Sequence, residues 1–147
     1  MRILVSACLL GLCCRYDGQG RACPGALRLA ARHELVPVCP EQLGGLPTPR
    51  PPAEIRGERV VSREGTDVTA AFQRGAREAL RLCRVMGCDC AVLKANSPSC
   101  GRDQVYDGYF TGTLVPGRGV TARLLIAHGI RVLTEEDLTD ADGVTGL

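Results

Sequence analysis

The stretch Cys90-Ala91-Val92-Leu93-Lys94-Ala95-Asn96-Ser97-Pro98-Ser99-Cys100-Gly101 decides how the chain folds. Its first half is a short apolar run, which is typical of a strand buried on both faces of a parallel sheet. Pro98 lacks a backbone N–H and Gly101 permits a sharp turn, so the strand ends within the second half. Cys100 therefore follows the carboxyl end of a strand, which is the edge at which open α/β sheets bind ligands.

Two other strand-like runs end in the same way, residues 3–7 before Cys8 and residues 34–38 before Cys39. If the three strands are parallel, Cys8, Cys39 and Cys100 meet at one edge of one sheet. Three soft thiolates suit an iron–sulfur cluster, copper(I) or zinc, and a set of three ligands leaves a coordination position open. The spacing matches no zinc-ribbon or ferredoxin pattern. The residues alone therefore leave both a metal site and a set of core thiols possible.

The rest of the chain alternates between strand-like and helix-like segments. We expect strands at 2–7, 34–38, 90–95 and 130–133, helices at 24–32, about 67–86 and 119–128, and a hairpin at 55–63. This order predicts one α/β domain over residues 1–147, a Rossmann-like three-layer sandwich with a mostly parallel sheet and helices on both faces. Prolines and glycines between about 40 and 57 predict a long active-site loop without regular structure, acting as an ordered lid.

Composition narrows the functional class. The net charge is only +2 and the arginines are spread along the chain, which argues against a nucleic-acid polymer as partner. No apolar run approaches the ~20 residues of a membrane span, and the apolar stretch before Cys8 is too short for a signal peptide. We therefore expect a reduced, cytoplasmic protein, in which nine cysteines indicate metal binding or catalysis more than disulfides.

Polar residues near the three cysteines could supply further chemistry. Glu41 follows Cys39 closely and is a candidate general base for water. Ser97 is a candidate hydrogen-bond donor to a substrate or to a cluster sulfur. Lys94, inside an apolar strand, is costly to bury unpaired, so we expect it to face a carboxylate such as Glu41 or Asp17, or to emerge at the strand end. The residues expected to bind substrate are Arg15, Asp17, Arg50, Lys94 and Ser99.

Five motifs in a fixed order resemble those of a known family. They are Ser6-Ala7-Cys8-Leu9-Leu10-Gly11 with Arg15-Tyr16-Asp17-Gly18, Cys39-Pro40-Glu41 with Gly44-Gly45-Leu46-Pro47-Thr48-Pro49-Arg50, Gly65-Thr66-Asp67-Val68-Thr69, Leu93-Lys94 with Ser97-Pro98-Ser99-Cys100-Gly101, and Tyr106-Asp107-Gly108. The chain resembles, over nearly its whole length, the family long known as domain of unknown function 523, whose characterised members are thiouracil desulfidases.

The resemblance implies an enzyme with a [4Fe–4S] cluster held by Cys8, Cys39 and Cys100. It implies that the fourth iron has no protein ligand and binds the sulfur of a small thiolated nucleobase or nucleotide. Glu41 corresponds to the acid/base glutamate of the family and Ser97 to a nearby serine, although Ser99 is equally close in sequence. The expected reaction is non-redox, hydrolytic cleavage of a carbon–sulfur bond, from thiouracil to uracil and hydrogen sulfide.

Two alternatives remain open at this point. Cys14 lies close enough to Cys8 in sequence to act as a fourth ligand, which would close the cluster. The protein would then be a non-catalytic iron–sulfur or zinc-binding sensor domain. The other alternative is a plain α/β domain whose reduced cysteines belong to the core, as we expect for Cys83, Cys88 and Cys90 in any case.

Overall fold

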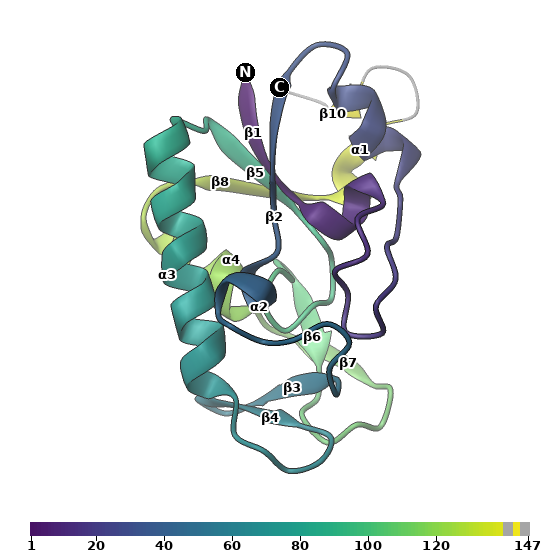
Figure 1. Cartoon of the computed structure of the whole chain (residues 1–147), viewed down its shortest axis with the longest axis vertical. Coiled ribbons are helices and arrows are strands. Elements are labelled where there is room, and N and C mark those ends of the chain that lie inside the picture. The colour runs from purple at the N-terminus through teal and green to yellow at the C-terminus, as the bar shows by residue number, and fades with distance from the viewer. Residues whose placement is uncertain (140–142, 145–147) are drawn as a thin grey trace.

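A four-stranded parallel sheet forms the centre of the molecule (Figure 1), as seen in a computed structural model that describes residues 1–139 and 143–144. The strands follow the order β2-β1-β5-β8, with bounds β1 (Arg2–Ser6), β2 (Glu34–Val38), β5 (Cys90–Leu93) and β8 (Arg131–Thr134). Every neighbouring pair is parallel, and Ile3 stands opposite both Leu35 and Cys90. The four carboxyl ends therefore lie at one edge of the sheet.

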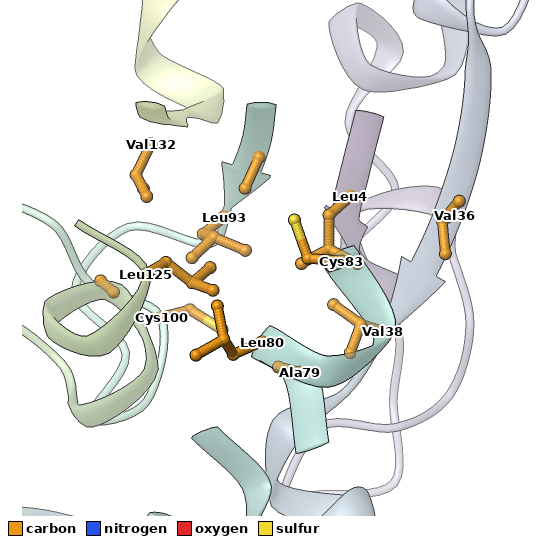
Figure 2. Packing of buried hydrophobic residues seen from close by; sticks show 12 residues of the cluster. Leu4, Val36, Val38, Ala79, Leu80, Cys83, Leu93, Cys100, Leu125 and Val132 are labelled. Atoms are coloured by element: carbon orange, nitrogen blue, oxygen red, sulfur yellow. The ribbon is translucent and has the colours of Figure 1, made fainter. Parts of the chain in front are cut away.

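Helices cover both faces of this sheet because successive strand residues point to opposite sides. Ile3 and Val5 face α1 (Pro24–Leu29), whose Ala26 and Leu29 are buried against them. Leu4 and Leu93 face the opposite layer, which contains α3 (Thr69–Met86) and α4 (Val120–Ala127) (Figure 2). The predicted α/β class, with a parallel sheet between two helical layers, is confirmed.

The order of the strands places a topological switch point at β1. From β1 the chain passes to β2 on one side, and it later returns to β5 on the other side. The segments that leave these strands diverge from one another, which is the arrangement that opens a crevice at the carboxyl edge. They are η1 (Ala7–Leu10) after β1, α2 (Pro40–Leu43) after β2, and the loop 94–101 after β5.

Two hairpins lie beyond this edge, at the bottom of Figure 1. They are formed by β3 (Ala53–Arg56) with β4 (Arg59–Ser62), and by β6 (Gln104–Tyr106) with β7 (Leu114–Pro116). Arg56 ties them together, since its Nε and Nη2 donate to the Gly108 carbonyl at 3.0 and 2.7 Å. The remaining elements are η2 (Glu135–Asp137) and the pair β9 (Leu138–Thr139) and β10 (Gly143–Val144).

Two glycines bring α2 directly against α3. A Cβ on Gly44 would lie 2.0 Å from the Ala71 carbonyl oxygen, and a Cβ on Gly75 would lie 1.9 Å from the Pro40 carbonyl oxygen. Both contacts are with backbone atoms, so no side-chain movement relieves them. This close approach fixes the position of the segment that carries Glu41.

The structure corrects the prediction for residues 40–57. That segment contains α2 and β3, so it is not free of regular structure. Pro40 occupies the first helical position, where its missing N–H is not needed, so a proline there starts a helix and does not exclude one. The hairpin also begins at Ala53, before the predicted start at residue 55, and the expected Gly-rich loop at 105–112 forms the tip of the β6–β7 hairpin.

The described part of the chain has no helix that is both long and apolar enough to cross a membrane.

Candidate active site

A cavity of about 450 Å³ opens at the carboxyl edge of the sheet. Cys8, Cys39 and Cys100 all line it, and they come from the segments that follow β1, β2 and β5. Cys8 and Cys100 are buried, whereas Cys39 is half-buried. The structure therefore brings together the three cysteines that the strand pattern selected.

The loop after β5 holds Cys100 through its serines. Ser97 Oγ accepts hydrogen bonds from the backbone N–H groups of Ser99 and Cys100, both at 3.1 Å. Ser99 Oγ lies 3.5 Å from Cys100 Sγ and 3.1 Å from Ser97 Oγ. Ser97 thus shapes the turn, while Ser99 presents its hydroxyl to the thiol.

Burial favours the protonated form of the Cys8 and Cys100 thiols. Burial raises the pKa of Cys100 to about 12, and it also raises the pKa of Cys8. Lys94 and Arg15 oppose the shift at Cys8, because positive charge favours the thiolate. A soft metal would displace these protons on binding, and the two cations would then stabilise the resulting negative charge.

Glu41 is held by two neighbours. Its Oε1 accepts from Arg50 Nε at 3.0 Å, and its Oε2 accepts from Ser99 Oγ at 3.3 Å. The Arg50 side chain is only 4 % exposed and that of Glu41 16 %, so the ion pair is screened little by solvent. This arrangement fixes the direction of the carboxylate while leaving it at the wall of the cavity.

Arg50 lines the cavity, and several acceptors hold its guanidinium group. Its Nη1 donates to the Pro47 carbonyl at 3.2 Å and to Thr48 Oγ1 at 3.0 Å, and its Nη2 donates to the Cys14 carbonyl at 3.0 Å. Together with the bond to Glu41, these contacts occupy the guanidinium group. These bonds connect Arg50 to Glu41, and the contact of Arg50 with substrate stays a prediction.

Lys94 has a different partner from the two that were predicted. Its Nζ lies 2.7 Å from Glu135 Oε2, and the other oxygen of Glu135 accepts from the Ala95 N–H at 2.7 Å. Glu135 follows β8, which is the neighbour of β5 in the sheet. The expectation that Lys94 faces a carboxylate is confirmed. The two carboxylates named as examples, Glu41 and Asp17, were wrong because the sequence does not say which strand lies beside β5.

The first loop contributes Arg15 to the cavity, whereas Asp17 is absent from its walls. The Asp17 carboxylate accepts from the Gln19 N–H at 3.0 Å and lies 3.9 Å from Arg15 Nη1. The structure therefore gives Asp17 a role in the loop and no place at the cavity, where it was expected to bind substrate.

Several wall residues were not predicted, and they come from the first loop and the two hairpins. Only the Tyr106-Asp107-Gly108 motif had pointed toward the second hairpin. The unpredicted residues with side chains suited to binding are Arg21, Glu54, Arg63, Tyr106 and Phe110.

Cys14 lies at the same site. It is buried, and its carbonyl accepts from Cys39 Sγ at 3.7 Å. Burial, followed by the nearby Cys39 and Cys8, raises the pKa of Cys14 to about 12. Cys13, the next residue back, is exposed. The structure thus keeps Cys14 as a candidate fourth sulfur.

The chemistry of the donor set suits an iron–sulfur cluster, whose ligands are thiolates. Across the described residues, no three Cys, His, Asp or Glu side chains are placed to hold one metal ion together. The ligands of an iron–sulfur cluster are thiolates that bind different iron atoms, so they stand apart around a larger volume. Three thiols spread over the wall of one cavity match that requirement.

A parallel α/β fold with thiols around a cavity at its carboxyl edge defines a class of protein that binds a metal–sulfur group next to a substrate pocket. Within that class the family assignment is specific, because residues 3–137 match the family described as 2-thiouracil desulfurase. The chain belongs to the 2-thiouracil desulfurase family, and the resemblance seen in the sequence is confirmed.

Two relatives extend this comparison. The chain is 41% identical, over 148 residues, to the uncharacterized protein YbbK of Bacillus subtilis (strain 168), with 94% of this chain and 98% of YbbK covered. It is 50% identical to a solved structure described as the [4Fe-4S]-dependent thiouracil desulfidase TudS (DUF523Vcz). That match has a TM-score of 0.85 and covers 93% of this chain and 92% of the solved chain.

Proposed function

We propose that this protein is a [4Fe–4S]-dependent desulfidase that converts thiouracil and water to uracil and hydrogen sulfide. The observation that carries the proposal is the cavity in which Cys8, Cys39 and Cys100 stand beside the anchored carboxylate of Glu41. Membership of the 2-thiouracil desulfurase family and the likeness to TudS support it.

Cys8, Cys39 and Cys100 are the residues that would hold the cluster. When bound, the cluster supplies a Lewis-acidic iron with affinity for a soft thiocarbonyl sulfur. Lys94 and Arg15 provide compensating positive charge at Cys8. Ser99 Oγ lies 3.5 Å from Cys100 Sγ and donates its single proton either there or to Glu41 Oε2.

Glu41 is the general base in this proposal. Its carboxylate takes a proton from the water that adds to the carbon bearing sulfur. The carbon–oxygen bond forms and the carbon–sulfur bond breaks, and the sulfur leaves as sulfide with two protons. No electrons are transferred, so the reaction needs neither an oxidant nor a reductant. Arg50 keeps the carboxylate aimed at the cavity throughout.

Ser99 is a stronger candidate than Ser97 for a hydroxyl that acts during the reaction. Ser97 Oγ accepts two backbone N–H bonds and is occupied in forming the turn. Ser99 Oγ instead lies within hydrogen-bonding distance of both Glu41 Oε2, at 3.3 Å, and Cys100 Sγ, at 3.5 Å. We therefore assign Ser99 to proton transfer between Glu41 and the leaving sulfur, and Ser97 to positioning.

The charges of the cavity favour a thiolated nucleotide over a free base. Arg15, Arg21 and Arg63 all line it. In the described part of the chain, no carboxylate pairs with Arg21 or Arg63, and Arg15 has only Asp17 at 3.9 Å. Guanidinium groups without carboxylate partners suit a phosphate, which they bind through parallel hydrogen bonds.

A cytoplasmic location is consistent with this chemistry. All nine cysteines are free in the structure, and a cluster held by thiolates requires reduced ligands.

Sulfide release by anaerobically reconstituted protein tests the proposal. We expect release from 4-thiouracil, and a lower KM for 4-thiouridine monophosphate if the arginines bind phosphate. Arg63→Gln should remove that difference between the two substrates. A protein that assembles the cluster but releases no sulfide from either compound would contradict the proposed function.

A non-catalytic iron–sulfur sensor is the second candidate, and the position of Cys14 favours it. If Cys14 supplies a fourth ligand, the cluster has no open iron. The Cys14→Ala variant separates the two candidates, because it would leave an open-site enzyme with its sulfide release but would change the spectrum of a four-cysteine cluster.

A further inference from the structure

The aromatic side chains of this protein are concentrated at the cavity. The chain has three tyrosines, two phenylalanines and no tryptophan. Tyr16, Tyr106 and Phe110 line the cavity, whereas Phe72 is buried in the core and Tyr109 is exposed. Tyr16 and Tyr106 are 41% and 38% exposed, so Phe110 is the most protected aromatic ring of the wall.

Phe110 adopts a backbone conformation that its side chain disfavours. Its φ is +57°, in the left-handed region, and Asn96 is the only other non-glycine residue with positive φ among those described. Asparagine tolerates this region, but a bulky residue there is an outlier, and such outliers cluster at functional sites. The surrounding contacts must therefore hold Phe110 in place.

Glu54 provides that restraint from the opposite hairpin. Its Oε1 accepts from the Phe110 N–H at 3.1 Å and from the Gly108 N–H at 3.0 Å. Gly108 is required for this approach, because a Cβ there would lie 2.4 Å from the Ile55 carbonyl oxygen. The two hairpins thus fix the peptide on which the Phe110 ring is carried.

The tip of the hairpin adds rigidity. Asp107 accepts from the Tyr109 N–H at 2.9 Å and from Thr111 Oγ1 at 2.6 Å. Arg63, another wall residue, places its guanidinium carbon 5.4 Å from the centre of the Phe110 ring. The ring therefore belongs to a restrained part of the cavity wall, next to the exposed Arg63.

We infer that Phe110 is the ring-recognition residue of this enzyme, and that it stacks on the pyrimidine and selects cyclic thio-substrates over small acyclic thioamides. This inference rests on the proposed function. A pyrimidine is flat and presents a π face, and its stacking on an aromatic side chain needs no hydrogen bond. Glu54 acts as a positioning residue, since it holds the Phe110 peptide and does not touch the substrate.

Binding of the product uracil to the reconstituted holoprotein isolates this contact, because uracil has no sulfur to bind iron. We expect Phe110→Leu, which keeps an apolar side chain but loses the π face, to raise the Kd of uracil roughly tenfold. The matched control is Tyr109→Leu, which removes the neighbouring exposed ring and its contact with Arg56. It should change the Kd less than about twofold.

Sulfide release extends the test to selectivity. Phe110→Leu should raise KM for 4-thiouracil and leave KM for thioacetamide unchanged. Phe110→Gly should bind uracil as weakly as Phe110→Leu yet unfold at a higher temperature than it, because glycine relieves the left-handed strain.

Equal weakening of uracil binding by Phe110→Leu and Tyr109→Leu, or none by either, would overturn the inference. Wild-type protein that binds uracil in a Phe110-dependent way but releases no sulfide would contradict the proposed function and leave the role of Phe110 intact.

Discussion

Two groups of cysteines lie near the central sheet, at opposite ends of its strands. Cys8, Cys39 and Cys100 follow the carboxyl ends of strands, whereas Cys83, Cys88 and Cys90 gather where α3 ends and β5 begins. Figure 2 shows that Cys83 and Cys100 even share one apolar cluster. Burial therefore does not distinguish the two groups.

The two groups of cysteines differ in their access to the cavity and in the residues around them. The first group lines a cavity that also contains Glu41 and Lys94. In the second group, Cys83 Sγ donates to the Cys88 carbonyl at 4.0 Å. Loops at the carboxyl edge diverge and leave space, whereas a helix that runs into a strand packs closely. The position of a cysteine in the topology, more than its burial, decides whether it can do chemistry.

The sharpest test of this comparison is removal of one cysteine from each group. Cys39→Ala should lose cluster iron and reduce sulfide release more than about 100-fold, because a ligand is missing. Cys83→Ala should keep its iron, since it only leaves a small gap in the core. Iron and acid-labile sulfide content after reconstitution measures both. Loss of iron in Cys83→Ala to the same extent would contradict the distinction.

Glu41→Gln tests whether the site that contains Cys8, Cys39 and Cys100 uses Glu41 as a general base. The variant keeps its shape but cannot take a proton, so we expect sulfide release to fall roughly 10²- to 10⁴-fold with iron content unchanged. Glu58→Gln, on the exposed turn between β3 and β4, is the matched control and should retain full rate. A Glu41→Gln enzyme with normal kcat would remove Glu41 from the mechanism.

Arg50→Lys tests the role of the Arg50 guanidinium group. Lysine keeps the charge but cannot reach Glu41, Thr48 and the Cys14 carbonyl together. We expect a roughly tenfold loss in kcat and a destabilisation of about 2 kcal/mol, because buried acceptors lose their donor. Urea unfolding monitored beside turnover separates the two effects. A loss of stability alone would show that Arg50 has no positioning role.

Glu135→Gln should have the smallest effect of the four. It weakens the contact with Lys94 but keeps an oxygen for the Ala95 N–H. For a partly exposed pair we expect about 1 kcal/mol or less in unfolding free energy. Because Lys94 then faces Cys8 with less restraint, the midpoint potential of the bound cluster should shift. An unchanged midpoint potential would show that the ion pair contributes only to the stability of the fold.

The sequence could predict the elements that carry a clear period. The strand expected at 34–38 has those bounds, and the strand expected at 90–95 covers Cys90–Leu93. Burial on both faces gives the run 90–93 a continuous hydrophobic signal. It could also predict that Cys8, Cys39 and Cys100 converge, since parallel strands share an edge. Short elements such as α2 were not predicted, because four residues are too few to show a helical period. Pro40 also suggested an interruption of regular structure.

The partners of individual side chains were harder to predict from the sequence than the helices and strands. Lys94 pairs with Glu135 only because β8 lies beside β5, and the order of strands is set by packing of the whole domain. Nothing local in the sequence reveals that the carbonyls of Pro47 and Cys14 accept from the Arg50 guanidinium group. The role of Phe110 depends on a left-handed backbone that the sequence does not announce.

The most direct measurement is sulfide release from 4-thiouracil by reconstituted wild-type protein, compared with Cys100→Ala and Cys14→Ala. The account predicts turnover in the wild type and in Cys14→Ala, and neither cluster nor turnover in Cys100→Ala. Full iron loading without sulfide release in the wild type, together with an altered cluster spectrum in Cys14→Ala, would contradict it and identify a closed, four-cysteine cluster.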